Sequence, residues 1–423
     1  MSNTDKTALV PKLRFPEFQK TPEWKEKRIG DFLSESRLPG SKGNVAKKLT
    51  VKLWGNGVFG KSELTQGSVN TQYFRRKSGQ FIYSKLDFLN QAFGVIPPKL
   101  DGFESTVDLP CFDIADELNP VFLLEYVKRK GFYERLGETA DGSRKARRIH
   151  AETFQSFPLV LPPPAEQKKI ADCLSSLDEL IVAQARKVDV LKTHKKGLVQ
   201  HLFPRDGETQ PRLRFPEFRN AGEWEWVELG EKVDLLSGYP FDGSDISKDS
   251  SGIPLLRGIN VTEGRIRHNS EIDRYYIGST KGIEKYRLQV NDLVIGMDGS
   301  KVGKNSALVS ENDVGALLIQ RVARLRAKKA PLIQFIFQRI HSPSFHAYVD
   351  RINTSSGIPH ISAKQIKEFR ICFPSEEEQQ HITNCLTTLD TLITTANQAL
   401  ETLKAHKKGL MQQIFPSPEV VDA

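Results

Sequence analysis

Residues Glu166–Pro204 read EQKKIADCLSSLDELIVAQARKVDVLKTHKKGLVQHLFP, and residues Glu378–Pro416 read EQQHITNCLTTLDTLITTANQALETLKAHKKGLMQQIFP. The two segments align without gaps at an offset of 212, with 19 of 39 positions identical. A shorter repeat precedes each of them, because Pro11–Phe18 (PKLRFPEF) returns as Pro211–Phe218 (PRLRFPEF) at an offset of 200. The chain therefore contains two copies of one long unit, which are too few for a solenoid.

Each long segment has the apolar pattern of a coiled coil. Apolar residues recur at alternating intervals of four and three over about five heptads, and the seam is interrupted by Gln184, Lys195 and Lys407. The predicted seam residues are Ile170, Leu174, Leu177, Ile181, Val188, Leu191, Leu198, Ile382, Leu386, Leu389, Ile393, Leu400, Leu403 and Leu410. At about 1.5 Å per residue, each helix would be roughly 55 Å long and unable to bury its seam alone. We expect the two copies to pair antiparallel; two ordinary long bundle helices are the alternative.

The regions between the repeats, from about residue 31 to 149 and from about 231 to 361, share little sequence. Short apolar runs such as FIYS and LVIGM predict strands, and VFLLEYVKRKGFYERL and PLIQFIFQRIHSPSFHAYV predict amphipathic helices. We therefore predict an α+β fold: two α+β domains separated by a pair of long antiparallel coiled-coil helices, in a pseudo-twofold internal repeat. The predicted segments are a first domain at 1–160, a helix within 161–204, a second domain at 205–374, a helix within 375–416 and a tail at 417–423.

The composition favours a polyanionic partner. Lys and Arg number 61 against 52 Asp and Glu, which gives a net charge of +9. The four cysteines, Cys111, Cys173, Cys372 and Cys385, form no C-x-x-C pair, so we expect neither structural disulfides nor zinc. The first residues lack the pattern of a secretion signal and no apolar run is long enough to cross a bilayer, so we expect a cytoplasmic protein.

Three enzyme motifs fail on inspection. Gly299–Lys304 (GSKVGK) has three residues between its glycines where a phosphate-binding loop has four, and Asn305 follows the lysine where Ser or Thr is needed. Asn119–Phe122 (NPVF) lacks the second proline of an adenine-methyltransferase motif. The E-x-K triplet at Glu23–Lys25 has no acidic partner in a suitable place before it. We expect no catalytic residue and no metal site.

The order of these elements resembles a known family. Each half has L-R-F-P-E-F and E-W, a divergent region, an entry ending in E-Q (PPPAEQ or PSEEEQ) and a long helix ending in K-K-G-L-x-Q-x-[LI]-F-P. This arrangement, over essentially the whole chain, resembles the specificity subunit of type I restriction-modification enzymes. The second entry departs from the first by having one proline, Pro374, where the first has three.

The resemblance implies a division of labour among subunits. The divergent regions would be target recognition domains that each read one half of a bipartite, asymmetric site in double-stranded DNA. The helices would set the spacing and dock two methyltransferase subunits, and restriction subunits would supply translocation and cleavage. S-adenosylmethionine and ATP would belong to those partners, so the chain would hold no cofactor of its own. A helix of roughly 55 Å corresponds to about 16 base pairs of duplex.

Cationic and polar clusters in the divergent regions are the candidates for DNA contact, since cations neutralise phosphates and polar side chains meet base edges. They are Lys47, Lys48, Arg75, Arg76, Lys77, Ser143, Arg144, Lys145, Arg147, Arg148, Arg257, Arg265, Arg267, Ser300, Lys301, Lys304, Asn305, Ser355, Ser356 and His360. The offset of 212 aligns Ser143 with Ser355 and Arg148 with His360, so the loops before the two helices are equivalent. Solvated surface loops are the alternative for each cluster. For the whole chain, the alternatives are a coiled-coil protein scaffold with an incidental basic surface and a standalone DNA-modifying enzyme.

Overall fold

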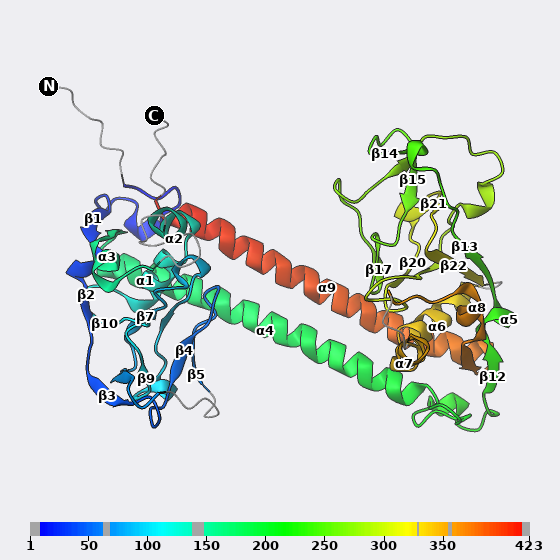
Figure 1. Cartoon of the computed structure of the whole chain (residues 1–423), viewed down its shortest axis with the longest axis horizontal. Helices are drawn as coiled ribbons and strands as arrows, with labels where there is room; N and C mark the ends of the chain where they lie inside the picture. Colours follow the sequence, from blue (N-terminus) through cyan, green and yellow to red (C-terminus); the bar gives the residue numbers. More distant parts are fainter. Residues whose placement is uncertain (1–8, 62–67, 138–147, 328–329, 354–357, 417–423) are drawn as a thin grey trace. The chain divides into compact units, whose positions relative to one another are not determined.

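The computed structural model describes residues 9–61, 68–137, 148–327, 330–353 and 358–416. The chain divides into two compact units, one formed by Met1–Ala185 with Gln398–Ala423 and the other by Arg186–Asn397. The first unit thus joins the start of the chain to its last helical turns. Each unit holds one α+β domain and parts of both long helices (Figure 1).

The two repeated segments form helices α4 (Pro164–Leu202) and α9 (Glu376–Ile414), each of 39 residues. Proline is tolerated in the first turn of α4, because amides there have no partner within the helix. The repeated glutamine at each entry has the same role, since Gln167 Nε2 donates to Pro162 O at 2.9 Å and Gln379 Nε2 donates to Pro374 O at 2.9 Å. The E-Q pair therefore marks where each helix begins.

The repeated L-R-F-P-E-F motif anchors the base of each helix. Arg14 Nε and Nη2 donate to the two carboxylate oxygens of Glu166 at 2.8 and 2.7 Å. Arg214 makes the same bidentate pair with Glu378 at 2.8 and 2.7 Å. Both glutamates are 1% exposed, so each pair is a buried, charge-assisted clamp between the segment before the domain and the helix after it. In the first unit Trp24 Nε1 also donates to Glu166, at 3.3 Å.

The Phe-Pro pair at the end of each long helix fills the core of a domain. Phe415 follows α9 and lies against Trp24 of the first unit, with ring centroids 6.2 Å apart. Phe203 follows α4 and lies against Trp224 of the second unit at 6.3 Å. The guanidinium groups that lie over these two phenylalanines belong to Arg129 and Arg339, respectively. The repeated E-W motif is thus a packing partner of the repeated F-P motif.

The apolar seams of α4 and α9 are shielded from solvent. Every predicted seam residue is buried or half-buried. The lysines that interrupt the seam bind aspartates of the other helix: Lys407 Nζ lies 2.8 and 2.7 Å from the oxygens of Asp178 in the first unit. Lys195 Nζ lies 2.6 and 2.7 Å from those of Asp390 in the second. The two pairs are equivalent under the offset of 212, and each joins one end of α4 to the opposite end of α9, as antiparallel packing requires.

The central sheet of the first domain has the order β2-β10-β7-β8, in strands Leu33–Glu35, Cys111–Ile114, Phe81–Tyr83 and Phe93–Val95. All its pairings are antiparallel. The second domain has the order β13-β22-β19-β20, in strands Val233–Ser237, Val322–Ala327, Leu293–Gly296 and Ser306–Leu308, again antiparallel throughout. Two regions with little common sequence therefore contain the same sheet, and they differ in the segments between its strands.

The remaining strands are short. In the first unit they are β1 (Lys25–Arg28), β3 (Pro39–Lys42), β4 (Leu49–Val51), β5 (Val58–Gly60), β6 (Gln72–Arg75), β9 (Glu104–Ser105) and β11 (Pro158–Leu161). In the second they are β12 (Glu225–Glu228), β14 (Ile246–Ser247), β15 (Ile253–Leu256), β16 (Val261–Thr262), β17 (Arg265–Ile266), β18 (Tyr275–Tyr276), β21 (Leu317–Leu318) and β23 (Arg370–Phe373). The antiparallel pairs β1–β11 and β12–β23 have equivalent registers and tie the two ends of each domain together.

Short helices cover the sheets. They are α1 (Pro120–Val127), α2 (Lys130–Gly137) and α3 (Ala151–Ser156) in the first unit, and α5 (Leu229–Lys232), α6 (Ala330–Ile340), α7 (Pro343–Ile352) and α8 (Ala363–Glu368) in the second. Their apolar faces join the main cores, which include Phe122 and Phe154 in the first unit and Phe335 and Phe345 in the second. Among the described residues, no helix combines the length and the apolar character that a membrane span needs.

Candidate nucleic-acid interface

A rigid loop joins β19 to β20 in the second domain and carries four of the candidate residues. Val302, in the middle of the loop, is 6% exposed and belongs to the core. Gly303 has φ +73°, and a Cβ there would lie 2.7 Å from Val349 of α7, so only glycine fits. The amides of Lys304 and Asn305 donate to Lys301 O at 3.1 and 3.0 Å. With Val302 and Gly303 buried, Ser300 and Lys301 are exposed and Lys304 and Asn305 are half-buried.

His360 lies beside this loop. Its Nδ1 makes a short hydrogen bond with Asp298 Oδ1, and Gly299 N donates to Pro359 O at 3.0 Å. Asp298 also pairs with the 73% exposed side chain of Arg321, whose Nε lies 3.2 Å from Oδ2. The structure thus gathers His360, Arg321 and the β19–β20 loop into one exposed group. Sequence reasoning missed Arg321, because nothing in the local sequence indicates that it lies next to Asp298.

The other candidate arginines of the second domain, Arg257, Arg265 and Arg267, lie around the β16–β17 hairpin, and two of them have partners within the fold. Arg265 is exposed on β17. Arg267 Nε donates to Ile259 O at 2.9 Å, and Arg257 Nη1 donates to Ile272 O at 3.1 Å. Arg257 is half-buried, so it stabilises the loop and offers less of its guanidinium to a ligand than Arg265 does.

In the first domain, Lys47, Lys48 and Arg75 lie together at the edge of the β3–β6–β9 sheet. Glu104 N donates to Lys47 O at 2.7 Å, and Arg75 pairs with Glu104 in the register of β6 and β9. Lys48 Nζ lies 5.7 Å from the ring centroid of Tyr73. The nearby carboxylate of Glu104 is 5% exposed and accepts from the amide and hydroxyl of Ser41, so it does not neutralise this edge at the surface.

Arg76 is withdrawn from the set of DNA-contact candidates. Its side chain is 2% exposed and donates to Ser105 Oγ at 2.8 Å, Ser36 O at 2.6 Å and Leu109 O at 3.2 Å. Burial lowers the pKa of its guanidinium. This cation cross-links loops inside the domain, while its neighbour Lys77 is exposed. The sequence run Arg75-Arg76-Lys77 predicted three contacts, but adjacent side chains at the end of a strand point to opposite faces, so Arg76 points into the domain.

The equivalence between Arg148 and His360 extends to their surroundings. Ile149 N donates to Lys85 O at 3.1 Å, and Ile361 N donates to Met297 O at 2.9 Å. These hydrogen bonds place Arg148 beside the β7–β8 loop, as His360 lies beside the β19–β20 loop. The Arg148 side chain is exposed. Ser143, Arg144, Lys145, Arg147, Ser355 and Ser356 lie outside the described residues.

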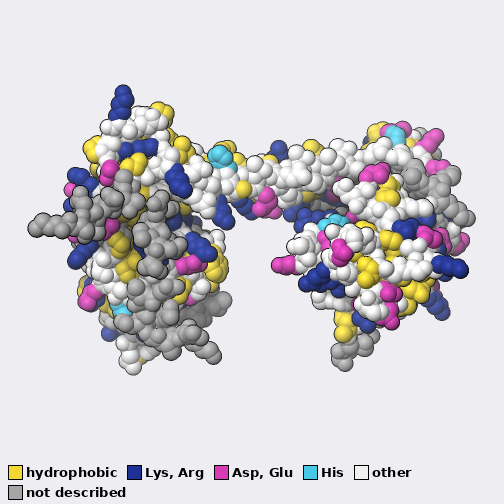
Figure 2. Space-filling view, turned by 90° about the horizontal axis from the view of Figure 1, so that it is seen from above, with side chains coloured by type: hydrophobic (Ala, Val, Ile, Leu, Met, Phe, Trp, Pro, Cys, Tyr) yellow, Lys and Arg dark blue, Asp and Glu magenta, His cyan; other side chains and the backbone are white. Residues whose placement is uncertain are grey.

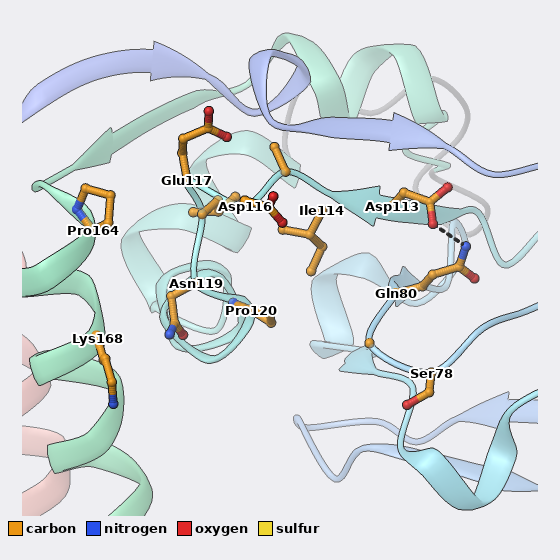
Figure 3. Close-up of a pocket in the computed structure, with 13 residues that line it drawn as sticks. Ser78, Gln80, Asp113, Ile114, Asp116, Glu117, Asn119, Pro120, Pro164 and Lys168 are labelled. Atoms are coloured by element: carbon orange, nitrogen blue, oxygen red, sulfur yellow. Dashed lines mark hydrogen bonds between the residues drawn. The ribbon is translucent and has the colours of Figure 1, made fainter.

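One hollow in the described part of the first unit is not lined by the candidate cations. This hollow of about 550 Å³ is lined instead by Asp113, Asp116, Glu117 and Lys168 among others (Figure 3). Its carboxylates make it unsuited to phosphate, and Asp113 Oδ1 accepts from Gln80 Nε2 at 2.8 Å. On the face seen in Figure 2, Lys and Arg side chains are mixed with Asp and Glu side chains over each unit. Candidate contact is therefore assigned to the particular loops described above.

A serine and a histidine of the second domain lie within hydrogen-bond distance of each other, but the serine is buried. Ser306 Oγ and His341 Nε2 are 3.0 Å apart, but Ser306 is 0% exposed and out of reach of a substrate. Burial lowers the pKa of His341 to about 4, so the imidazole stays neutral at neutral pH. No cluster of His, Cys, Asp and Glu suited to a metal ion occurs in the described part of the chain.

Comparisons with known proteins agree with the repeat architecture. Residues 221–405 match the family model described as "Type I restriction modification DNA specificity domain". The chain is 25% identical over 413 residues to the type I restriction enzyme MjaVIII specificity subunit of Methanocaldococcus jannaschii, covering 95% of this chain and 93% of the relative. Over nearly its whole length, the chain is therefore similar to a type I restriction-modification specificity subunit. It is also 29% identical over 226 residues to the EcoAI specificity subunit of Escherichia coli, covering 52% of this chain and 36% of that one.

Solved structures share the fold of this chain. A crystal structure of the type I restriction-modification S subunit from M. genitalium has a TM-score of 0.61 at 14% identity, covering 96% of this chain and 99% of that one. A chain from a study of complex assembly in a type I system has a TM-score of 0.55 at 16% identity, covering 92% and 96%. At these identities the likeness concerns the fold alone. The relatives found by sequence are named specificity subunits of type I restriction enzymes.

Proposed function

We propose that this specificity subunit reads a bipartite, asymmetric sequence in double-stranded DNA, one half through each domain. The observation that carries the proposal is the repetition of one four-stranded sheet in two domains whose exposed loops differ. A constant sheet with variable loops suits two readers that face the same kind of ligand but recognise different bases. The unbroken helices α4 and α9 would fix the distance between them.

The proposed DNA contacts are the members of the two loop groups that are exposed or half-buried. They comprise Lys47, Lys48, Arg75, Lys77 and Arg148 in the first domain and Arg265, Arg267, Ser300, Lys301, Lys304, Asn305 and His360 in the second, with Arg257 at its margin. Ser143, Arg144, Lys145, Arg147, Ser355 and Ser356 stay in the proposal from their place in the sequence. Arg321 is added, because it pairs with the aspartate that holds His360.

Docking of two modification subunits is supported by apolar side chains that the long helices leave exposed. Leu180 of α4 is 54% exposed, and Leu392 of α9, its equivalent at the offset of 212, is 49% exposed. Val182 and Val190 of α4 are 59% and 61% exposed. A large apolar residue repeated on two equivalent helices offers two equivalent contact surfaces. We propose that each binds one methyltransferase subunit, that these partners hold S-adenosylmethionine, and that restriction subunits holding ATP join the cytoplasmic complex.

The stoichiometry gives a direct test. Co-expression with the methyltransferase subunit of the same type I system should yield two copies per specificity subunit, measured by native mass spectrometry. Leu180→Glu or Leu392→Glu alone should leave one copy, and both together should leave none. Gln200→Glu, at an exposed polar position of α4, is the control and should keep both. Two copies retained by the double variant would refute docking on these surfaces.

DNA contact is tested by the salt dependence of binding. Lys301→Ala with Lys304→Ala should weaken binding to duplex DNA and reduce the slope of log K against log salt by about one for each phosphate that is no longer neutralised. In a host, the same change should alter only one half of the methylated motif found by methylome sequencing. A change in both halves would show that the two domains do not read independently.

A further inference from the structure

The turn between β4 and β5 of the first domain exposes a tryptophan. Trp54 is 61% exposed, whereas Trp24 and Trp224 are each 2% exposed. Its backbone has φ +59°, the left-handed region that a bulky side chain disfavours. Neither burial nor backbone preference explains a tryptophan here, and strain kept at an exposed position points to a binding role.

The turn is held rigidly against a neighbouring loop. Trp54 N donates to Asn90 O at 2.7 Å, and Gly55 N donates to Gln91 O at 2.9 Å. Gly55 has φ +67°, and a Cβ there would lie 2.9 Å from Cε of Lys128. The indole is therefore presented from a fixed backbone, which lowers the entropy lost when a ligand is bound.

The loop that holds the turn is the first domain's counterpart of the candidate DNA loop in the second. Asn90 and Gln91 lie between β7 and β8, the strands that correspond to β19 and β20. Arg148 lies beside this loop as His360 lies beside the other. Trp54 thus borders the place where, in the second domain, Lys301 and Lys304 are found.

The surroundings are cationic. Residues 47–61 contain four lysines, at 47, 48, 52 and 61, and no aspartate or glutamate. Phe59, on β5, is 44% exposed, and Lys99 Nζ lies 5.9 Å from its ring centroid. The one acidic residue of the sequence between β7 and β8 is Asp87, whose carboxylate accepts from Ser84 Oγ at 3.0 Å. Aromatic side chains among lysines match a ligand with phosphates and flat apolar faces, which describes nucleic acid.

We propose that Trp54 is a base-contacting wedge of the first domain, which meets the bases of duplex DNA while the lysines of the β4–β5 hairpin contact its phosphates. This inference rests on the DNA binding under the proposed function. The hairpin adds a stacking or wedge contact to the hydrogen bonds expected of the candidate loops. Duplex DNA is favoured over an apolar protein surface because the hairpin bears only positive charge.

The test uses Trp54→Gly in the full chain. Glycine adopts φ +59° without strain, so the fold should be at least as stable as the wild type, and weaker binding cannot be ascribed to unfolding. Binding to random-sequence duplex DNA should weaken about tenfold or more, because the variant cannot stack on a base. The salt slope should not change, since no cation is removed, whereas Lys52→Ala with Lys61→Ala should flatten it. Asn291→Gly, another residue with positive φ (+66°), is the control for strain relief and should keep full affinity.

The outcomes distinguish failure of the Trp54 proposal from failure of the proposed DNA-reading function. If the wild type binds DNA and Trp54→Gly binds equally well, the wedge is refuted and DNA reading by the specificity subunit stands. If Trp54→Gly instead releases a methyltransferase subunit and keeps its DNA affinity, the turn is a protein contact and the proposal is wrong. If the wild type, alone and with its methyltransferase subunits, shows no salt-dependent binding to DNA, both the wedge and the proposed function fail.

Discussion

Lys407, the lysine in the seam of α9, should contribute more to the free energy of unfolding than Lys195, the equivalent lysine of α4. Lys407 is 14% exposed and binds two carboxylates, those of Asp178 and Glu125, at 2.7 and 3.0 Å. Glu125 is 4% exposed, so Lys407→Met would leave a buried negative charge with Lys128 as its remaining partner. We expect a loss of about 2–3 kcal/mol, below the usual range for a broken buried pair because Lys128 stays.

Lys195→Met is the matched control. Lys195 is 19% exposed, but its partner Asp390 is 40% exposed and can be hydrated when the lysine is gone. That variant should lose only about 0.5–1 kcal/mol, since solvent screens the pair. Amide hydrogen exchange in increasing urea, read by mass spectrometry over residues 398–414 and 186–202, reports the free energy of opening in each unit separately.

Removing the orphaned charge should rescue the larger loss. Adding Glu125→Gln to Lys407→Met takes away the charge that the first change left unpaired, so at least half of the lost stability should return. Equal losses in the two lysine variants, or no rescue by Glu125→Gln, would refute the idea that a buried third charge distinguishes the two ends.

Further predictions concern pH, hydrogen bonding and thiol reactivity. Burial raises the pKa of Glu125, but the nearby charges of Lys128 and Lys407 outweigh burial, and the net pKa is lowered. The charged carboxylate therefore stabilises the fold fully above pH 4.5, the ordinary pKa of glutamate, and this stabilisation is lost as the pH falls through the lowered pKa of the folded state. The gap in stability between wild type and Lys407→Met should therefore be constant near neutral pH and shrink in acid, as urea titrations at several pH values would show. Trp24→Phe should destabilise its unit by about 1 kcal/mol more than Trp224→Phe destabilises the other, because Trp24 Nε1 donates to Glu166 whereas Trp224 Nε1 has no hydrogen-bond partner among the described residues; equal losses would contradict this. Burial raises the pKa of Cys111 to about 12 and of Cys372 to about 11, so a thiol reagent should label these two last in the native chain, and early labelling of either would be inconsistent with the packing.

The lysine pairs also show how the register of the long helices is specified. An apolar seam alone tolerates sliding by a heptad, because leucine and isoleucine pack against one another at several offsets. A lysine in the seam finds an aspartate only in one register, and a slipped register would bury it unpaired. Lys195 with Asp390 and Lys407 with Asp178 impose that condition once in each unit.

Much about this protein follows from its sequence. The α+β class and the family can be predicted from repetition, because duplicated motifs such as L-R-F-P-E-F and E-Q are recognisable without any contact being known. The seam residues could be named because helical periodicity is local, and in the structure each lies buried or half-buried. Repetition also identified Lys195 and Lys407 as exceptions in the seam, although their partners lie on the other helix and were not predicted.

Only the tertiary structure decided which distant residues meet. It paired Arg14 with Glu166 and Phe415 with Trp24, and it placed the last turns of α9 in the unit of the first domain, which no linear division of the chain anticipates. It also showed that regions with little common sequence hold one sheet, since backbone pairing and burial tolerate many apolar side chains. Exposure was settled there too: Arg76 is buried and Trp54 is exposed, because the direction of a side chain depends on the neighbours that fold against it and not on its own chemistry.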